Sequence, residues 1–206
     1  RAQVTVNTVA PALRLVDGGN GVGPLVGMHA LRAAMAAATE CGVGIAFARA
    51  SNHFGPVSPY SLIAAQSGFA SIIGSNATTT IAPWGGSDAR LGNSPIGFGV
   101  PNPGGDPFLL DMAMSVVARA KIRRALKQGQ SIPDTWATDQ AGRPTTDPAA
   151  ALDGFLLPIG GHKGYGLALM VDLFAGLLSN AAYLTHVKSW VEAPDEPQNL
   201  GHFFIL

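Results

Sequence analysis

The sequence predicts an α/β protein whose sheet contains both parallel and antiparallel strands. Short apolar stretches of strand length alternate with stretches whose apolar residues recur at helical spacing, a pattern typical of layered α/β folds. The 206 residues are 47% hydrophobic and 13% charged with a net charge of zero, which is typical of a globular chain. Irregular connections between the stretches favour a mixed sheet over a purely parallel one. We expect one domain covering residues 1–206.

The first part of the chain alternates strand and helix signals. Strands are expected at residues 4–9, 13–17 and 43–50. Between the second and third strands, a glycine-rich turn precedes an amphipathic helix, whose apolar face is formed by Met28, Leu31, Met35 and Ala38. Gly42 stands where a left-handed residue commonly ends a helix.

The rest of the chain is less regular. Pro59 is placed to begin a helix that Gly68 ends. Residues 75–107 are rich in Gly, Pro, Asn and Thr, and so long an irregular stretch in a compact domain is usually functional. The other expected elements are strands at 70–74, 96–100 and 108–112, a helix at 115–127, a turn-rich stretch at 129–148 and a helix at 163–180. The apolar face of the last helix is formed by Leu167, Met170, Val171, Phe174, Leu177 and Leu178.

Signals for several other functions are missing from the sequence. The glycines at 18–23 have the wrong spacing for G-x-G-x-x-G, and Lys163 does not complete a Walker A pattern, so neither phosphate-binding loop is present. The histidines show no H-x-x-x-H pairing, Cys41 is alone and no G-x-S-x-G occurs, which argues against a zinc site, internal disulfides and a serine hydrolase. Acidic and basic residues number 13 each, so no nucleic-acid partner is expected.

The sequence also gives no sign of a membrane span. The apolar run at 164–178 contains Asp172 and is shorter than the roughly 18 to 20 residues that cross a bilayer. The chain does not begin with an apolar leader, so we expect a cytoplasmic location. The charged fraction is about half of the roughly 25% typical of soluble domains, which predicts that a subunit interface covers part of the surface.

A polar cluster, SNHFGP at 51–56, directly follows the apolar run at 43–50. Loops on rigid elements commonly carry binding and catalytic groups. The His53 imidazole can exchange a proton near neutral pH, and Gly55 would let a ligand approach the backbone closely. The alternative is that His53 is structural or merely solvated.

Two further clusters lie in the irregular stretch and just after it. APWGG and LGNSP place the Asn93 amide where it could meet a carboxylate or a carbonyl, or they form two turns beneath Trp84. In LDMAMS, a strand enters a helix, and Ser115 is expected to cap it. The N-terminus of that helix would also accept an anion.

The last cluster is PIGGHKGYG at 158–166. A lysine in a loop is commonly just solvated. Lys163, however, stands among glycines at the start of a helix, which suits a phosphate or a ribose.

Together these strings resemble the malate/L-lactate dehydrogenase family, which also holds ureidoglycolate, sulfolactate and piperideine-2-carboxylate enzymes. The resemblance rests on SNHFG, APWGG with LGNSP, LDMAMS, SIPDTWATDQAGRPTTDP and PIGGHKGYGLALMVDLFAGLL. It runs from Arg1 to Leu206 and covers the middle of the family's length, so the chain is expected to lack the family's N-terminal helical portion and its C-terminal segment. It implies a non-Rossmann, three-layer α/β/α fold with a mixed sheet, and a homodimer with the active site near the interface.

The function implied by the resemblance is hydride transfer between NAD or NADP and a small 2-hydroxy or 2-oxo acid of the malate or lactate kind. One alternative is a cyclic imino acid reductase of the same family. Another is a catalytically silent fragment that only dimerises and binds cofactor. No metal is implied.

The resemblance also assigns roles to individual residues. His53 matches a histidine that lies against the cofactor and is proposed as the base in the ureidoglycolate members. Asn93 and Arg119, with Ala120, match substrate-contacting positions. The Ser-His pair that many members use as proton donor has no match in this chain. The matched cofactor-binding residues are His53, Phe54, Gly55, Pro56, Val57, Asp111, Met112, Ala113 and Lys163.

Overall fold

The centre of the fold is a seven-stranded mixed sheet in the order β1-β2-β3-β11-β4-β7-β8, seen in a computed structural model that describes residues 2–191 and 193–206. β2 and β3 are parallel, and the other neighbouring pairs are antiparallel. The expected mixed sheet is therefore confirmed. Its strands are β1 (Thr5–Ala10), β2 (Leu13–Asp17), β3 (Ile45–Ser51), β4 (Ser71–Ser75), β7 (Ile96–Val100), β8 (Phe108–Met112) and β11 (Leu200–Ile205).

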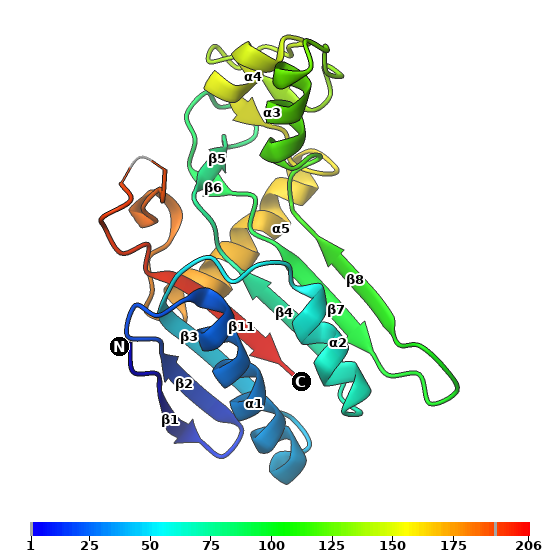
Figure 1. The fold of residues 1–206 in the computed structure, drawn as a ribbon, viewed down its shortest axis with the longest axis vertical. Helices are drawn as coiled ribbons and strands as arrows, with labels where there is room; N and C mark the ends of the chain where they lie inside the picture. The colour runs from blue at the N-terminus through cyan, green and yellow to red at the C-terminus, as the bar shows by residue number, and fades with distance from the viewer. Residues whose placement is uncertain (1, 192) are drawn as a thin grey trace.

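Helices cover both faces of this sheet (Figure 1). α1 (Gly23–Cys41) and α2 (Ser58–Gln66) pack on one face, where they share a core with Phe204. On the opposite face, Phe203 packs against α5 (His162–Asp172) and the π-helical turn η1 (Leu173–Leu177). Neighbouring residues of a strand point to opposite faces, so β11 contributes to both cores. The three-layer, non-Rossmann architecture is confirmed.

A smaller sheet forms a second lobe with α3 (Arg119–Lys127) and α4 (Pro148–Asp153), at the top of Figure 1. This lobe has its own apolar core, to which Ala168 of α5 also belongs. α5 therefore connects the two lobes. The expectation of a single domain stays a prediction, which a single cooperative unfolding transition would support. The strands, in the order β6-β5-β10-β9, are β5 (Thr79–Ile81), β6 (Leu91–Gly92), β9 (Ala137–Thr138) and β10 (Phe155–Leu156).

Several elements lie where the sequence predicts them. β2, β7 and β8 have the expected bounds. α1 ends at Gly42, which has a φ of 77° and donates its N–H to the Ala38 carbonyl at 2.8 Å. The predicted left-handed end of this helix is confirmed.

Several predictions about residues 75–180 were wrong in detail. The helix expected at 115–127 begins only at Arg119, and the Ser115 hydroxyl donates to the Val117 carbonyl at 2.8 Å instead of capping it. The helix expected at 163–180 is α-helical only to Asp172 and then continues as the π-helical turn. The stretch 75–107 contains β5 and β6 as well as β7.

The central strand β11 was not predicted. Gly201 and His202 near its start are not typical strand residues, and the segment before it is rich in proline and charge. Gly201 is required because a Cβ there would overlap the Ala175 carbonyl oxygen of the helix that covers it. A short 3₁₀ helix, η2 (Leu184–His186), precedes this segment.

No helix in the described part of the chain is long and apolar enough to cross a membrane. Large apolar side chains are nevertheless exposed on β8 and α5, including Phe108 (71%) and Leu167 (58%). The predicted apolar face of α5 is thus only partly buried within one copy of the chain.

Candidate active site

The SNHFGP loop connects the end of β3 to the start of α2, and two contacts hold its first residues. The Asn52 amide donates to the Gly21 carbonyl at 2.9 Å, which ties the loop to the glycine-rich turn before α1. The His53 backbone N–H donates to Gln198 Oε1 at 3.3 Å. The loop therefore has a fixed path between its two elements.

The His53 side chain is exposed, as a group that meets a ligand must be. The Gly55 N–H donates to His53 Nδ1 at 3.3 Å, so Nδ1 acts as an acceptor and the neutral ring carries its proton on Nε2. On one side the ring stacks nearly parallel to Trp190, with centroids 5.8 Å apart and an interplanar angle of 7°. The indole is itself 61% exposed, so the pair lies at the surface.

The other loop residues predicted to bind the cofactor differ in what they can offer. Phe54 and Val57 are buried in the core, so neither offers its side chain to a ligand at the surface. Pro56 is exposed. Gly55 has a φ of +83°, and a Cβ built there would meet no heavy atom within 4 Å, so the backbone is open on that side.

Asp111 joins β8 to this loop. Its Oδ2 accepts a hydrogen bond from the Ser58 N–H at 2.8 Å, at the first turn of α2. The structure thus gives Asp111 a role in fixing the loop, and its carboxylate stays exposed. Met112 and Ala113, which follow it, are half-buried.

The segment after β8 also contacts Asn93 and the glycine-rich loop before α5. The Met114 N–H donates to the Asn93 carbonyl at 2.8 Å, and the Ile159 N–H donates to the Met114 carbonyl at 2.9 Å. Three clusters that are far apart in sequence therefore lie side by side. The Asn93 side chain is half-buried.

Lys163 is the second residue of α5, and its side chain is exposed. Gly160 and Gly161 before the helix have φ values of 58° and 64°, which favour glycine. Trp84 packs over this loop, with its ring edge-on to His162 at a centroid distance of 6.1 Å. The APWGG and GGHKG clusters are thus brought together.

Arg119 lies at the start of α3, in the smaller lobe. Its guanidinium donates a hydrogen bond to the Leu152 carbonyl of α4. Ala120 beside it is exposed. The predicted contact of Arg119 with substrate stays a prediction.

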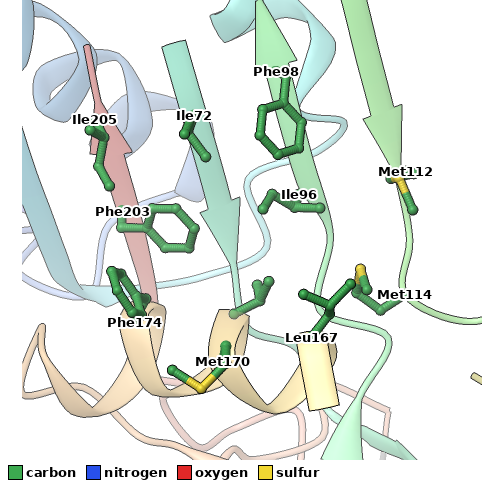
Figure 2. A pocket seen from close by; sticks show the side chains of 11 residues that line it. Ile72, Ile96, Phe98, Met112, Met114, Leu167, Met170, Phe174, Phe203 and Ile205 are labelled. Carbon is green, nitrogen blue, oxygen red and sulfur yellow. The ribbon is translucent and has the colours of Figure 1, made fainter. Parts of the chain in front are cut away.

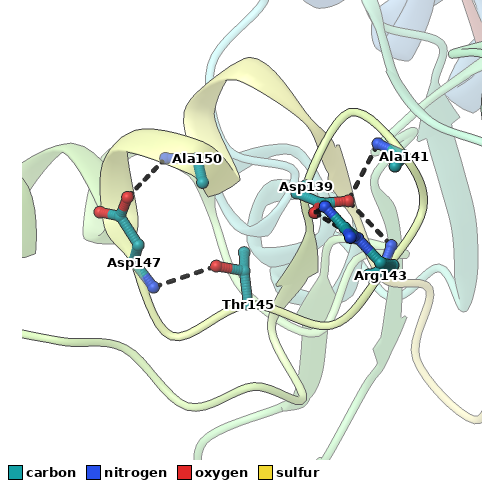
Figure 3. A network of polar contacts seen from close by, with 6 residues as sticks. All are labelled: Asp139, Ala141, Arg143, Thr145, Asp147 and Ala150. Atoms are coloured by element: carbon teal, nitrogen blue, oxygen red, sulfur yellow. Dashed lines mark hydrogen bonds and ion pairs between the residues drawn. The ribbon is translucent and has the colours of Figure 1, made fainter.

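The TDQAGRPTTDP string builds the smaller lobe (Figure 3). Asp139 accepts from the backbone N–H groups of Ala141 and Arg143, both at 2.9 Å, and pairs with the Arg143 guanidinium at 2.9 Å. The backbone hydrogen bond from Arg143 is the main reason why the pKa of Asp139 is lowered. Asp147 caps α4 by accepting from the Ala149 N–H at 3.0 Å. These residues are structural.

An apolar cavity of about 320 Å³ lies between the sheet and α5 (Figure 2). It includes Met112 of the predicted site but not His53, Asn93 or Lys163. Side chains of β4, β7 and β11 line one side of it, and those of α5 the other (Figure 2). Its lining carries no charge, so it does not suit a 2-hydroxy acid.

Sequence reasoning missed the contribution of residues 187–202. This segment supplies Trp190 against the His53 ring, Gln198 against its backbone and the buried His202 beneath the loop. Burial lowers the pKa of His202 to about 3, with a smaller contribution from the nearby His53 charge. Only the histidine and the GHFF apolar run could have drawn attention to this segment.

Among residues 2–191 and 193–206, no three His, Cys, Asp or Glu side chains gather as a metal site would require. The sequence pattern of the malate/L-lactate dehydrogenase family matches residues 1–206. The chain belongs to the malate/L-lactate dehydrogenase family.

Relatives in this family have been named for several substrates. The chain is 38% identical to the malate dehydrogenase of Pyrococcus horikoshii, covering 99% of the chain and 58% of that protein. It is 41% identical to the Delta(1)-pyrroline-2-carboxylate reductase of Ancylobacter novellus, covering 95% of the chain and 57% of that protein. The solved sulfolactate dehydrogenase of Methanocaldococcus jannaschii superposes with a TM-score of 0.91 at 38% identity, covering 100% of the chain and 59% of that structure.

The chain therefore spans less than two thirds of the length of these relatives. The superposition with the sulfolactate dehydrogenase covers the whole of this chain, so both lobes have counterparts in that structure. Membership of the family supports an oxidoreductase.

Proposed function

We propose that this protein transfers a hydride between NAD or NADP and a small 2-hydroxy or 2-oxo acid. The observation that carries the proposal is the exposed His53, on a loop that leads into α2. The Ser58 N–H at the start of α2 bonds Asp111, and Met114, three residues further along, bonds the Asn93 segment and the loop before Lys163. An imidazole at the surface of a fixed loop is suited to proton transfer. Family membership supplies the reaction class.

The residues on the chain fit a nicotinamide dinucleotide. The open side of Gly55 leaves room for a planar ring near His53, and a Cβ at Gly160 would likewise meet nothing within 4 Å. The start of α5 has no side-chain cap, so its first backbone N–H groups and the Lys163 ammonium suit a phosphate. When bound, the nicotinamide supplies or accepts the hydride. His53, Gly55, Pro56, Asp111, Ala113 and Lys163 would hold it.

His53 would manage the proton. In reduction, a doubly protonated ring gives its exposed Nε2 proton to the carbonyl oxygen of the 2-oxo acid. In oxidation, Nε2 must be free to take the hydroxyl proton, so the proton of the neutral ring must first move to Nδ1. Both this tautomer and the doubly protonated ring carry a hydrogen on Nδ1, so both must give up the Gly55 hydrogen bond, which at 3.3 Å is weak.

Asn93 and Arg119 are proposed to meet the substrate. The half-buried Asn93 amide can donate to a carboxylate or a carbonyl oxygen. Arg119 already donates to Leu152, so its guanidinium would reach a carboxylate by changing rotamer.

The reaction is tested by following the absorbance of NADH and NADPH with a panel of 2-oxo acids. Pyruvate, oxaloacetate and sulfopyruvate represent the lactate, malate and sulfolactate kinds. Turnover of one of them supports the proposal. The chain and any longer protein that contains it should be assayed side by side, because binding without turnover in both would indicate a silent cofactor-binding scaffold.

A cyclic imino acid reductase is the second candidate, because one relative at 41% identity is named as such. The same assay with a five- or six-membered cyclic imino acid separates the two. An imine needs a proton donor in the same place as a carbonyl, so His53 would keep its role.

Replacing Lys163 with alanine should raise the KM for the cofactor about 10-fold and change that for the 2-oxo acid much less. The reason is the loss of a charge-assisted hydrogen bond to phosphate, worth roughly 1.5 kcal/mol. Steady-state kinetics with each substrate varied in turn measures both constants. Lys127, exposed at the end of α3, is the matched control. An unchanged cofactor KM would remove Lys163 from the site.

We also propose that the protein acts as a homodimer. Large apolar side chains are exposed on β8 and α5, and those of Leu167 and Met170 also line the apolar cavity in Figure 2, so a second copy of the chain would cover apolar surface there. Sedimentation velocity at micromolar concentration should give the mass of two chains. A single-chain mass there would contradict the proposal.

A further inference from the structure

A buried histidine lies directly beneath the SNHFGP loop. His202 of β11 is fully buried, between the two strands that pair with β11. Its Nδ1 is 2.8 Å from the Ser75 hydroxyl of β4, and its Nε2 is 2.7 Å from the Ser51 hydroxyl of β3. One imidazole thus joins three adjacent strands through side chains, at the point where the loop begins.

The hydrogen positions follow from what each serine can donate. The Ser75 hydroxyl donates its single hydrogen to the Asn76 carbonyl at 2.9 Å, so it accepts from His202 Nδ1–H. Nε2 of the neutral ring then carries no hydrogen, so the Ser51 hydroxyl donates to it at 2.7 Å rather than to the Asn52 carbonyl, which lies farther away at 3.3 Å. Burial keeps the ring neutral, since it lowers the pKa of His202 to about 3.

The same imidazole packs on Phe54. The two rings are stacked at a centroid distance of 4.3 Å and an angle of 5°. Tyr60 stacks on Phe54 at 4.9 Å, and its hydroxyl donates to the Phe54 carbonyl at 2.7 Å. Phe54 is therefore held both by its ring and by its backbone.

We propose that His202 is a positioning residue for His53, fixing the loop on both sides of it. Ser51 and Phe54 stand two residues before and one residue after His53, and His202 contacts both. The exposed His53 ring has only weak contacts of its own, so its direction depends on these two neighbours. The inference rests on the proposed function for the role of His53 in proton transfer. The contacts by which His202 fixes the loop do not depend on that function.

The test compares the loss of one hydrogen bond with the loss of both. Ser51→Ala removes the contact with Nε2 and adds no bulk, whereas His202→Phe keeps an aromatic ring against Phe54 and removes both hydrogen bonds. The matched control is Ser71→Ala on β4, because the Ser71 hydroxyl is also buried but has no hydrogen-bond partner among the described residues.

In kinetics, Ser51→Ala should lower kcat about 10- to 100-fold, the size expected from a misplacement of the reacting group by up to about 1 Å. The cofactor KM should change less than about 3-fold, and Ser71→Ala should match the wild type. The Ser51→Ala and His202→Phe effects should not add, since both act through one contact. Equal losses in kcat for Ser51→Ala and Ser71→Ala would overturn the proposal.

NMR tests the positioning role of His202 without any turnover, so its result does not depend on the proposed function. Histidine ring nitrogen NMR should show His202 neutral and protonated on Nδ1 at neutral pH. Ser51→Ala should shift the His53 ring and Trp190 indole resonances, and Ser71→Ala should not.

Unchanged His53 and Trp190 resonances in Ser51→Ala overturn the proposal even if the enzyme is active. Shifted resonances in a protein without turnover support it while contradicting the proposed function. Ser75→Ala replaces His202→Phe if the latter does not fold.

Discussion

Replacing His53 with alanine is expected to lower kcat by about 10²- to 10⁴-fold without unfolding the protein. The loss is that of a general acid–base group, because alanine cannot exchange a proton with the substrate oxygen. The fold should survive, since the side chain is exposed and its ring contacts are a stack with Trp190 and one long hydrogen bond. Steady-state kinetics and a thermal melt of the same preparation measure the two effects.

The control is His186, which is also exposed but lies on the 3₁₀ helix and packs beside Tyr183. His186→Ala should keep full activity. His53→Gln adds a second comparison, since an amide keeps polarity but cannot carry the proton. Full turnover in His53→Ala would assign the proton to another group and remove the central residue of the proposed site.

The sequence could predict the segments of this site better than their contacts. SNHFGP was expected at the exit of a strand because an apolar run ends there, and β3 does end at Ser51. The partners of the loop could not be predicted in the same way. Ser51 and His202 are 151 residues apart and meet only because β11 enters the sheet between β3 and β4. No local pattern encodes that strand order.

Some side chains are more buried than the sequence pattern predicts, and others are more exposed. Phe54 stands in a polar loop, yet it is buried because Tyr60 and His202 enclose it. Met170 belongs to the predicted apolar face of α5, yet it is 48% exposed. A helical period says which residues share a face, but whether that face is covered depends on what packs against it.

Asp172 is expected to make the stability of the protein fall as the pH rises through the acidic range. Its side chain is fully buried at the end of α5, where Oδ1 accepts from the Leu184 N–H at 3.0 Å and Oδ2 has no hydrogen-bond partner among the described residues. Burial without a second partner raises the pKa of Asp172 to about 6. The ionised form therefore destabilises the folded state.

The sign follows from linkage. Because the folded-state pKa lies above the unfolded value of 3.8, the folded state binds more protons between these two values. The free energy of unfolding therefore falls as the pH rises from about 4 to about 6 and changes little from this source above that range. A difference of about two pKa units corresponds to about 3 kcal/mol.

Asp172→Asn should remove this decline. The Asn oxygen can still accept from the Leu184 N–H, but the side chain cannot ionise. Relative to the wild type, the free energy of unfolding of the variant should therefore rise by about 3 kcal/mol between pH 4 and pH 7, as measured by urea denaturation at each pH. Other carboxylates, including Asp17, whose pKa is lowered mainly by the Gly19 N–H, are common to both proteins and cancel in the difference.

The exposed Asp153 at the end of α4 provides the control, since Asp153→Asn should give no pH-dependent difference of this size. The absolute stability of Asp172→Asn is less informative than its pH dependence, because the new amide N–H₂ is buried beside the same unpartnered position, at a cost of about 1 to 3 kcal/mol. That cost is independent of pH, so it shifts the whole curve and leaves the slope intact. Parallel curves for the wild type and Asp172→Asn between pH 4 and pH 7 would mean that a group within reach of Oδ2 stabilises the ionised carboxylate.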